Sequence, residues 1–205
     1  MDGLGIETRI KKGNVCTIAG RPCMGKTVVA VNLSKNLAKA QKVLYVDTEG
    51  VLKFNFEEFN FDFIRISTLP KIIEIIAKNS YDVVIVDGFQ YIKYRYAENT
   101  AYVFKTVAKA MNIAVVILSH IPRRCGTRRD MRPKHSDIKD KKMCGCLYKY
   151  SDSIIFLYRD YYYLQKNDDI MEFIEYDKGF FRKRHTINKV PFEILKDNIY
   201  SSSLD

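Results

Sequence analysis

The sequence contains no apolar run that approaches the roughly 20 residues needed to cross a bilayer. Its N-terminus, Met1-Asp2-Gly3-Leu4-Gly5, lacks the basic segment followed by an apolar segment that is typical of secretion signals. These absences argue against a membrane-spanning or secreted protein. We therefore expect a soluble, cytoplasmic protein with no membrane partner.

Paired cysteine motifs are also absent. The cysteines are Cys16, Cys23, Cys125, Cys144 and Cys146, and none forms a C-x-x-C pair. This pattern is typical of reduced thiols in an intracellular protein. Together with His135, the last three cysteines could be imagined as zinc ligands, but their spacing matches no usual finger or ribbon, so no metal centre of this kind is predicted.

The chain has neither internal repeats nor low-complexity segments, and its 205 residues, 47% of them hydrophobic, suit one sizeable core. We expect a single domain over residues 1–205. Glycines and prolines separate strand-like stretches that alternate with helix-like ones. This alternation predicts an α/β fold with a mostly parallel, twisted sheet and helices on both faces.

A phosphate-binding loop stands near the start of the chain. Residues 20–27 read G-R-P-C-M-G-K-T, a G-x-x-x-x-G-K-T motif between an apolar strand-like run and a helix-like stretch. In such loops backbone N–H groups cradle phosphate oxygens, the lysine contacts the β- and γ-phosphates, and the threonine hydroxyl ligates Mg²⁺. The predicted ATP-binding residues are Gly20, Arg21, Pro22, Cys23, Met24, Gly25, Lys26, Thr27 and Val28.

Two later strand-like runs end in carboxylates. Residues 42–46 precede Asp47 and Glu49, and the β-branched run 83–86 precedes Asp87. Ligand-binding residues of parallel sheets lie at the carboxyl ends of strands. Glu49 is therefore our candidate for orienting or deprotonating the attacking water, and Asp87 for holding Mg²⁺ with Thr27. The alternative is that these acids lie on the surface or have a purely structural role.

A third apolar run, residues 113–119, ends at His120. An imidazole at this edge of the sheet is placed to hydrogen-bond the γ-phosphate and to relay its presence to the following loop. A capping or surface histidine without such a role is the alternative interpretation.

Most of the net charge of +10 lies in one loop, about residues 121–150. Between Pro122 and Tyr150, ten basic residues stand against three acidic ones, a net charge of +7. A basic loop beside the nucleotide edge suits a phosphate backbone, although a solvated loop explains the same charges. The candidate nucleic-acid-binding residues are Arg123, Arg124, Arg128, Arg129, Arg132, Lys134, Lys139, Lys141 and Lys142.

The C-terminal part predicts a β-hairpin at about residues 170–195. Its basic tip, Arg182-Lys183-Arg184, either contacts DNA or a neighbouring subunit's nucleotide, or is a plain solvated turn.

Several motifs together resemble the C-terminal, RecA-like motor domain of DnaB-type replicative helicases. Residues 20–27 resemble that family's A-R-P-S-M-G-K-T. Residues 86–92 (V-D-G-F-Q-Y-I) are similar to its I-D-Y-L-Q-L-M, and residues 132–139 (R-P-K-H-S-D-I-K) to its R-P-x-x-S-D-L-R. Residues 151–160 continue the match in the same order, whereas residues 46–50 (V-D-T-E-G) look more like recombinases of the RecA type.

The resemblance implies a P-loop NTPase in which Lys26, Thr27, Glu49 and Asp87 serve ATP and Mg²⁺, and His120 senses the γ-phosphate. It also implies that the basic loop faces DNA in the channel of a ring. The family's K-x-R-N-G segment, which acts on the neighbouring subunit's ATP, aligns with residues 175–179, E-Y-D-K-G. The family's N-terminal domain and linker helix have no counterpart in this sequence.

We therefore expect an ATP-binding, DNA-dependent ATPase related to replicative helicases and acting on single-stranded DNA. The alternatives are a nucleotide-binding adaptor or helicase remnant that hydrolyses ATP weakly or not at all, or a recombinase-like RecA paralogue. A homo-oligomer, either a hexameric ring or a filament, or a partner helicase completes these expectations.

Overall fold

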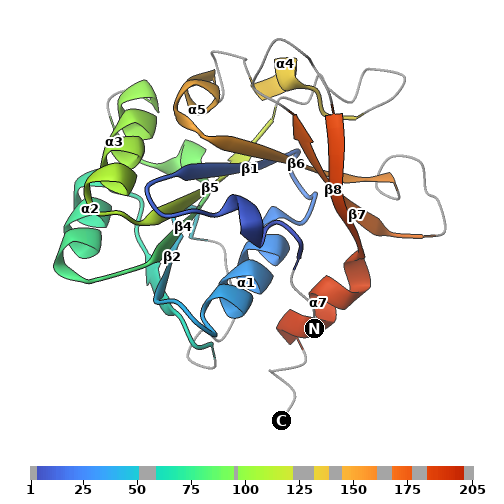
Figure 1. Ribbon diagram of the computed structural model, residues 1–205, viewed down its shortest axis with the longest axis horizontal. Helices are drawn as coiled ribbons and strands as arrows, with labels where there is room; N and C mark the ends of the chain where they lie inside the picture. Colours follow the sequence, from blue (N-terminus) through green and yellow to red (C-terminus); the bar gives the residue numbers. More distant parts are fainter. Residues whose placement is uncertain are drawn as a thin grey trace.

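The computed structural model describes residues 4–50, 59–94, 97–121, 132–138, 145–160, 168–176 and 184–200 (Figure 1). Its centre is an eight-stranded sheet with the order β3-β2-β4-β5-β1-β6-β7-β8. The strands are β1 (Val15–Gly20), β2 (Val43–Asp47), β3 (Asp62–Arg65), β4 (Val83–Asp87), β5 (Ala114–His120), β6 (Ser153–Arg159), β7 (Ile170–Tyr176) and β8 (Arg184–Pro191).

The six strands from β3 to β6 in the sheet are parallel, and β7 and β8 continue the sheet as antiparallel neighbours. All residues of β2 and β4 are buried. Continuous apolar runs are what a parallel strand covered on both faces requires. The expected mostly parallel α/β sheet is confirmed.

Helices cover both faces of this sheet (Figure 1). Helices α1 (Lys26–Leu37) and α7 (Phe192–Tyr200) pack on one face with Ile18 and Ile85 of the central strands. Helices α2 (Leu69–Lys78), α3 (Ala97–Ala110) and α5 (Gly145–Tyr150) pack on the other with Val84 and Val86. The short elements are η1 (Glu7–Arg9), η3 (Phe89–Tyr91) and α4 (His135–Ile138). Among the described residues, no helix has the length and apolar character to cross a membrane.

The C-terminal hairpin ends earlier than the sequence predicts. The β7–β8 ladder stops at the pair Ile170–Pro191, and α7 begins at the next residue. Proline has no N–H to extend a ladder, and Phe192 and Leu195 are spaced to bury their side chains on one helix face. The tail of the predicted hairpin is therefore a helix that packs against α1.

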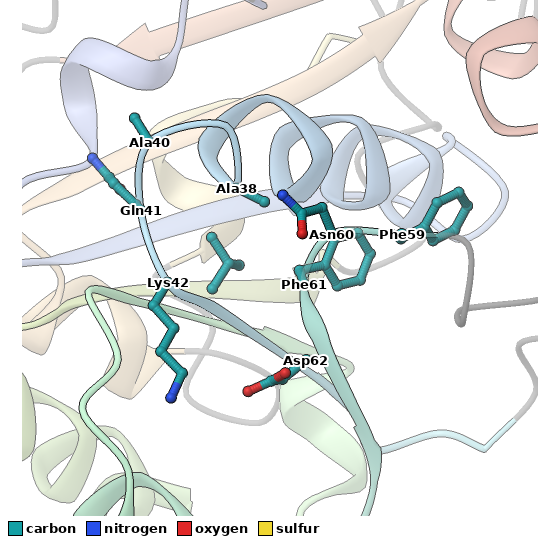
Figure 2. A pocket seen from close by; sticks show the side chains of 9 residues that line it. Ala38, Ala40, Gln41, Lys42, Phe59, Asn60, Phe61 and Asp62 are labelled. Atoms are coloured by element: carbon teal, nitrogen blue, oxygen red, sulfur yellow. The ribbon is translucent and has the colours of Figure 1, made fainter.

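A pocket of about 440 Å³ lies where α1 ends and where β2 and β3 begin (Figure 2). Ala38, Lys42 and Asp62 line it, together with the stacked rings of Phe59 and Phe61. It lies at the amino ends of the strands, away from the carboxyl ends that carry the predicted site residues.

Candidate nucleotide site

The carboxyl ends of four neighbouring strands bring the predicted residues together. In the parallel register Asp47 at the end of β2 pairs with Asp87 at the end of β4, and Gly20 at the end of β1 pairs with His120 at the end of β5. The paired positions are 40 or more residues apart along the chain, and the sheet places them along one edge. This edge is the candidate nucleotide site.

The loop between β1 and α1 has the backbone that its glycines predict. Gly25 adopts a left-handed conformation with φ of +85°, and helix α1 begins at the next residue. A side chain at Gly25 would be strained by this conformation and would also collide with Phe192, whose Cε2 atom lies 2.4 Å from the position of an added Cβ. The backbone of the loop thus depends on glycine at this position.

Lys26 is buried beneath the loop. Its Nζ atom donates hydrogen bonds to the carbonyl oxygens of Gly20 at 3.2 Å and Arg21 at 2.9 Å. Burial lowers the pKa of Lys26 to about 8, and the carboxylate of Asp87 limits this fall. The amine is therefore a cation held at the loop by main-chain acceptors, which anionic phosphate oxygens can replace.

Thr27 and Asp87 form the part of the site that fits a metal ion. The Thr27 hydroxyl donates a hydrogen bond of 2.7 Å to Oδ2 of Asp87, which joins α1 to the end of β4. Asp87 is almost completely buried, and burial raises its pKa, while hydrogen bonds from Thr27 and Tyr45 limit the rise. A hydroxyl and a carboxylate are the hard oxygen ligands that Mg²⁺ takes beside nucleotide phosphates, so these residues fit the expected ion.

The two acids after β2 have different surroundings. Asp47 is buried, and its carboxylate accepts hydrogen bonds from the N–H groups of Glu49 and Gly50 and from Arg65. Glu49 is exposed at the edge of the site. Asp47 therefore shapes the turn, and Glu49 is the acid that water and a nucleotide can reach.

His120 and Tyr91 complete the edge next to Glu49. The Tyr91 hydroxyl is hydrogen-bonded to Glu49, an interaction that raises the pKa of the phenol. The Tyr91 ring meets the His120 ring edge-on, with ring centres 6.2 Å apart. Burial, and secondarily the charge of Lys26, lowers the pKa of His120 to about 4, so the imidazole is neutral at physiological pH.

Phe192, Arg159 and Asp169 border the loop from the C-terminal part of the chain, and the sequence alone did not point to them. The Arg159 guanidinium lies 3.4 Å from the centre of the Phe192 ring, and its Nε donates to Asp169 at 2.7 Å. The backbone N–H of Phe192 donates to the carbonyl oxygen of Asp169, also at 2.7 Å. No sequence motif links residues so far apart, because only the antiparallel extension of the sheet brings them to the loop.

Two of the nine basic residues proposed to contact nucleic acid lie among the described residues, and the other seven lie outside them. Arg132 forms an ion pair with the buried Glu172 and lies over the Tyr158 ring at 4.6 Å. Lys134 is exposed, and its backbone N–H donates to Asp137. Nucleic-acid contact by Arg132 stays a prediction, but the structure gives this side chain an intramolecular partner.

Comparison with known proteins places the chain in a family. A sequence model described as the DnaB-like helicase C-terminal domain matches residues 60–189, more than half of the chain. The chain belongs to this family. The resemblance drawn from the motifs is thereby confirmed.

Relatives agree with the family. The replicative DNA helicase DnaB of Buchnera aphidicola subsp. Baizongia pistaciae is 27% identical over 213 residues, which cover 78% of this chain and 45% of that protein. A probable replicative DNA helicase of Trieres chinensis is 24% identical over 78% of this chain and 46% of its own length. The chain thus spans less than half the length of these two relatives.

Solved structures show the fold. A helicase ATPase domain superposes with a TM-score of 0.73 at 21% identity, covering 92% of this chain and 89% of that one. A DnaB-like replicative helicase, described with its interactions with primase, has a TM-score of 0.70 at 22% identity and covers 93% and 58% of the two chains. The fold is the RecA-like fold of helicase ATPase domains.

This DnaB-like domain carries an acid where the resembling K-x-R-N-G segment begins with lysine. Glu175 lies in β7 and forms an ion pair of 2.7 Å with Arg9 of η1. Residues 177–180, with the rest of that segment, and the basic tip residues Arg182 and Lys183 lie outside the described residues, as does the side chain of Arg184. At Glu175 the carboxylate is engaged within its own chain.

Proposed function

We propose that this DnaB-like domain binds ATP with Mg²⁺ and hydrolyses the γ-phosphate in a reaction stimulated by single-stranded DNA. The observation that carries the proposal is the hydrogen bond of 2.7 Å between Thr27 and Asp87. It joins the phosphate-binding loop to the carboxylate at the end of β4, as a shared Mg²⁺ site requires. The buried cation of Lys26 lies at the same loop.

Each residue of the site has a distinct part in this proposal. The loop N–H groups and Lys26 bind the phosphates, and Thr27 and Asp87 hold the metal ion, which would offset charge on the β- and γ-phosphates. Glu49 orients the attacking water and accepts its proton. The neutral imidazole of His120 offers one N–H donor toward the γ-phosphate, because its low pKa removes the charged form at pH 7.

The test compares Lys26→Ala with Lys35→Ala, which removes a lysine from the same helix where its side chain lies over Phe59. ATPase rates are measured with and without single-stranded DNA, beside the molar mass in solution. We expect DNA-stimulated turnover in the wild type and in Lys35→Ala, and its loss in Lys26→Ala. Full turnover in Lys26→Ala refutes the assignment of the site, and a measured mass shows whether a monomer, a ring or a filament forms.

The DNA part of the proposal rests on the charge of the basic loop. Binding of single-stranded DNA across a salt series measures the number of phosphates that the protein contacts. Reversing charge at Arg128 and Arg129 should flatten the dependence of log K on log salt concentration. An unchanged slope would indicate that the loop contacts another partner, such as protein.

A second candidate function is a nucleotide-binding adaptor that hydrolyses ATP slowly or not at all. It is favoured by Glu175, an acid held by Arg9 where the resembling segment begins with a lysine, two residues before its arginine. An arginine supplied to a neighbouring site can raise hydrolysis by about 10³-fold or more. This candidate fails if the purified protein turns over ATP at a rate that Glu49→Gln abolishes.

A further inference from the structure

Tyr45 is a buried residue of β2 that the proposed chemistry does not use. Its side chain has no solvent exposure, yet its hydroxyl donates a hydrogen bond of 2.7 Å to Oδ2 of Asp87. A buried tyrosine needs some partner for its hydroxyl, and the backbone offers many acceptors. Here the acceptor is the carboxylate that the site offers to the metal ion.

The sheet fixes the position of this hydroxyl. Tyr45 pairs with Ile85 across β2 and β4, and Asp87 lies two residues further along β4, on the same face. This diagonal distance is within reach of an aromatic side chain. Phe61 stacks on the Tyr45 ring with centres 6.0 Å apart, and Phe63 contacts it at 5.9 Å. The phenol is therefore held in place from two sides.

The main chain of Asp87 is held by the same strand end. The N–H of Thr48 donates to the Asp87 carbonyl oxygen at 3.1 Å, and the Thr48 hydroxyl donates to that oxygen at 2.7 Å. With the backbone fixed, only the side-chain torsions of Asp87 remain to be set. The hydroxyls of Tyr45 and Thr27, which both donate to Oδ2, set them.

These two donors differ in what they do when metal binds. Thr27 is itself an expected metal ligand, so its hydroxyl cannot serve only to orient the carboxylate. Tyr45 makes no use of the metal and holds Oδ2 whether or not the ion is present. Groups that orient a metal ligand from behind raise affinity because the ligand is already ordered before the ion arrives.

We propose that Tyr45 is a positioning residue for Mg²⁺ that acts through Asp87, an inference that rests on the proposed ATP–Mg²⁺ site. Its hydroxyl holds the carboxylate toward Thr27, so that the two metal-binding oxygens are arranged in advance. Tyr45 itself touches neither nucleotide nor metal. Loss of its hydroxyl should therefore change the metal requirement and leave metal-free nucleotide binding in place.

The test is Tyr45→Phe, which removes one oxygen atom and keeps the ring. Binding of a fluorescent ADP analogue is measured in EDTA and then across a Mg²⁺ titration. We expect the Mg²⁺ concentration at half-effect to rise by about 10-fold, the lower end of what losing such a supporting group costs. Affinity in EDTA should stay within about twofold. Tyr81→Phe is the matched control, because its hydroxyl donates to Asp62 at 2.9 Å, away from the loop.

The outcomes separate this inference from the function on which it rests. If Mg²⁺ does not affect nucleotide binding by the wild type, the proposed function fails. If the wild type responds and Tyr45→Phe responds at the same Mg²⁺ concentration, the positioning role is wrong. Weaker binding in EDTA as well would also overturn it, because the loss would then lie in the phosphate loop.

A second measurement covers the case in which Tyr45→Phe does not fold. 3-Fluorotyrosine introduced at position 45 keeps the hydroxyl and gives a ¹⁹F signal beside Asp87. Adding Mg²⁺ to the nucleotide-bound protein should shift this signal and leave that of 3-fluorotyrosine at position 81 unchanged. An unshifted signal at position 45 contradicts the proposal.

Discussion

Arg132→Gln tests whether this arginine stabilises the fold or binds nucleic acid. In the structure its guanidinium forms an ion pair with Glu172, which is 6% exposed, and lies 3.8 Å from Asp160. Glu172 also pairs with Lys189 at 2.5 Å, but the Lys189 side chain is 58% exposed. Removing Arg132 would leave a buried carboxylate with one solvated partner.

The expected loss of stability follows from these contacts. Breaking a buried ion pair costs about 3–5 kcal/mol when the remaining charge has no other partner. The Arg132 side chain is 23% exposed and Lys189 remains beside Glu172, so we take about 2 kcal/mol as the loss. For a protein of this length that loss lowers Tm by about 4–8 °C.

The assay measures Tm and DNA binding for Arg132→Gln and for Lys134→Gln, which removes the same charge from an exposed side chain two residues away. We expect Arg132→Gln to lower Tm and Lys134→Gln to leave it within about 1 °C. If Lys134 binds a phosphate, its replacement should reduce the salt slope by about 0.7 for a single strand. An unchanged Tm with a reduced slope in Arg132→Gln would refute the structural role and restore the predicted DNA contact.

Three further changes have defined outcomes. Gly25→Ala should abolish nucleotide binding and lower Tm, since φ of +85° costs an L-residue about 1–2 kcal/mol and the added Cβ would collide with Phe192; wild-type affinity would contradict this. Asn32→Leu removes buried hydrogen bonds to Val28 and Leu195, and should cost about 1–3 kcal/mol in urea unfolding by loosening α7 from α1. His120, whose pKa falls from 6.5 unfolded to about 4 folded, should lower stability as pH falls from 6.5 to 4, because the unfolded chain takes up the proton first; His120→Asn should show a weaker pH dependence of the urea midpoint.

The local sequence determined the loop, the strands and the ends of the strands. A buried parallel strand must be apolar throughout, so residues 83–86 could be recognised without knowing their neighbours. The G-x-x-x-x-G-K-T spacing similarly predicts a loop that turns its N–H groups toward phosphate. Because parallel strands end at one edge, the proximity of Asp87 and His120 to the loop also followed from the sequence.

Tertiary structure alone decided which side chains surround those positions. The partnership of Tyr45 with Asp87 depends on the β2–β4 register, in which the hydroxyl reaches a residue 42 positions away. The packing of Phe192 on Gly25 depends on where α7 begins, after the ladder stops at Pro191. Glu172 engages Arg132 because β7 extends the sheet antiparallel to β6. Local patterns report propensity and burial, whereas hydrogen bonds and ion pairs between distant residues depend on register and packing, which no single segment encodes.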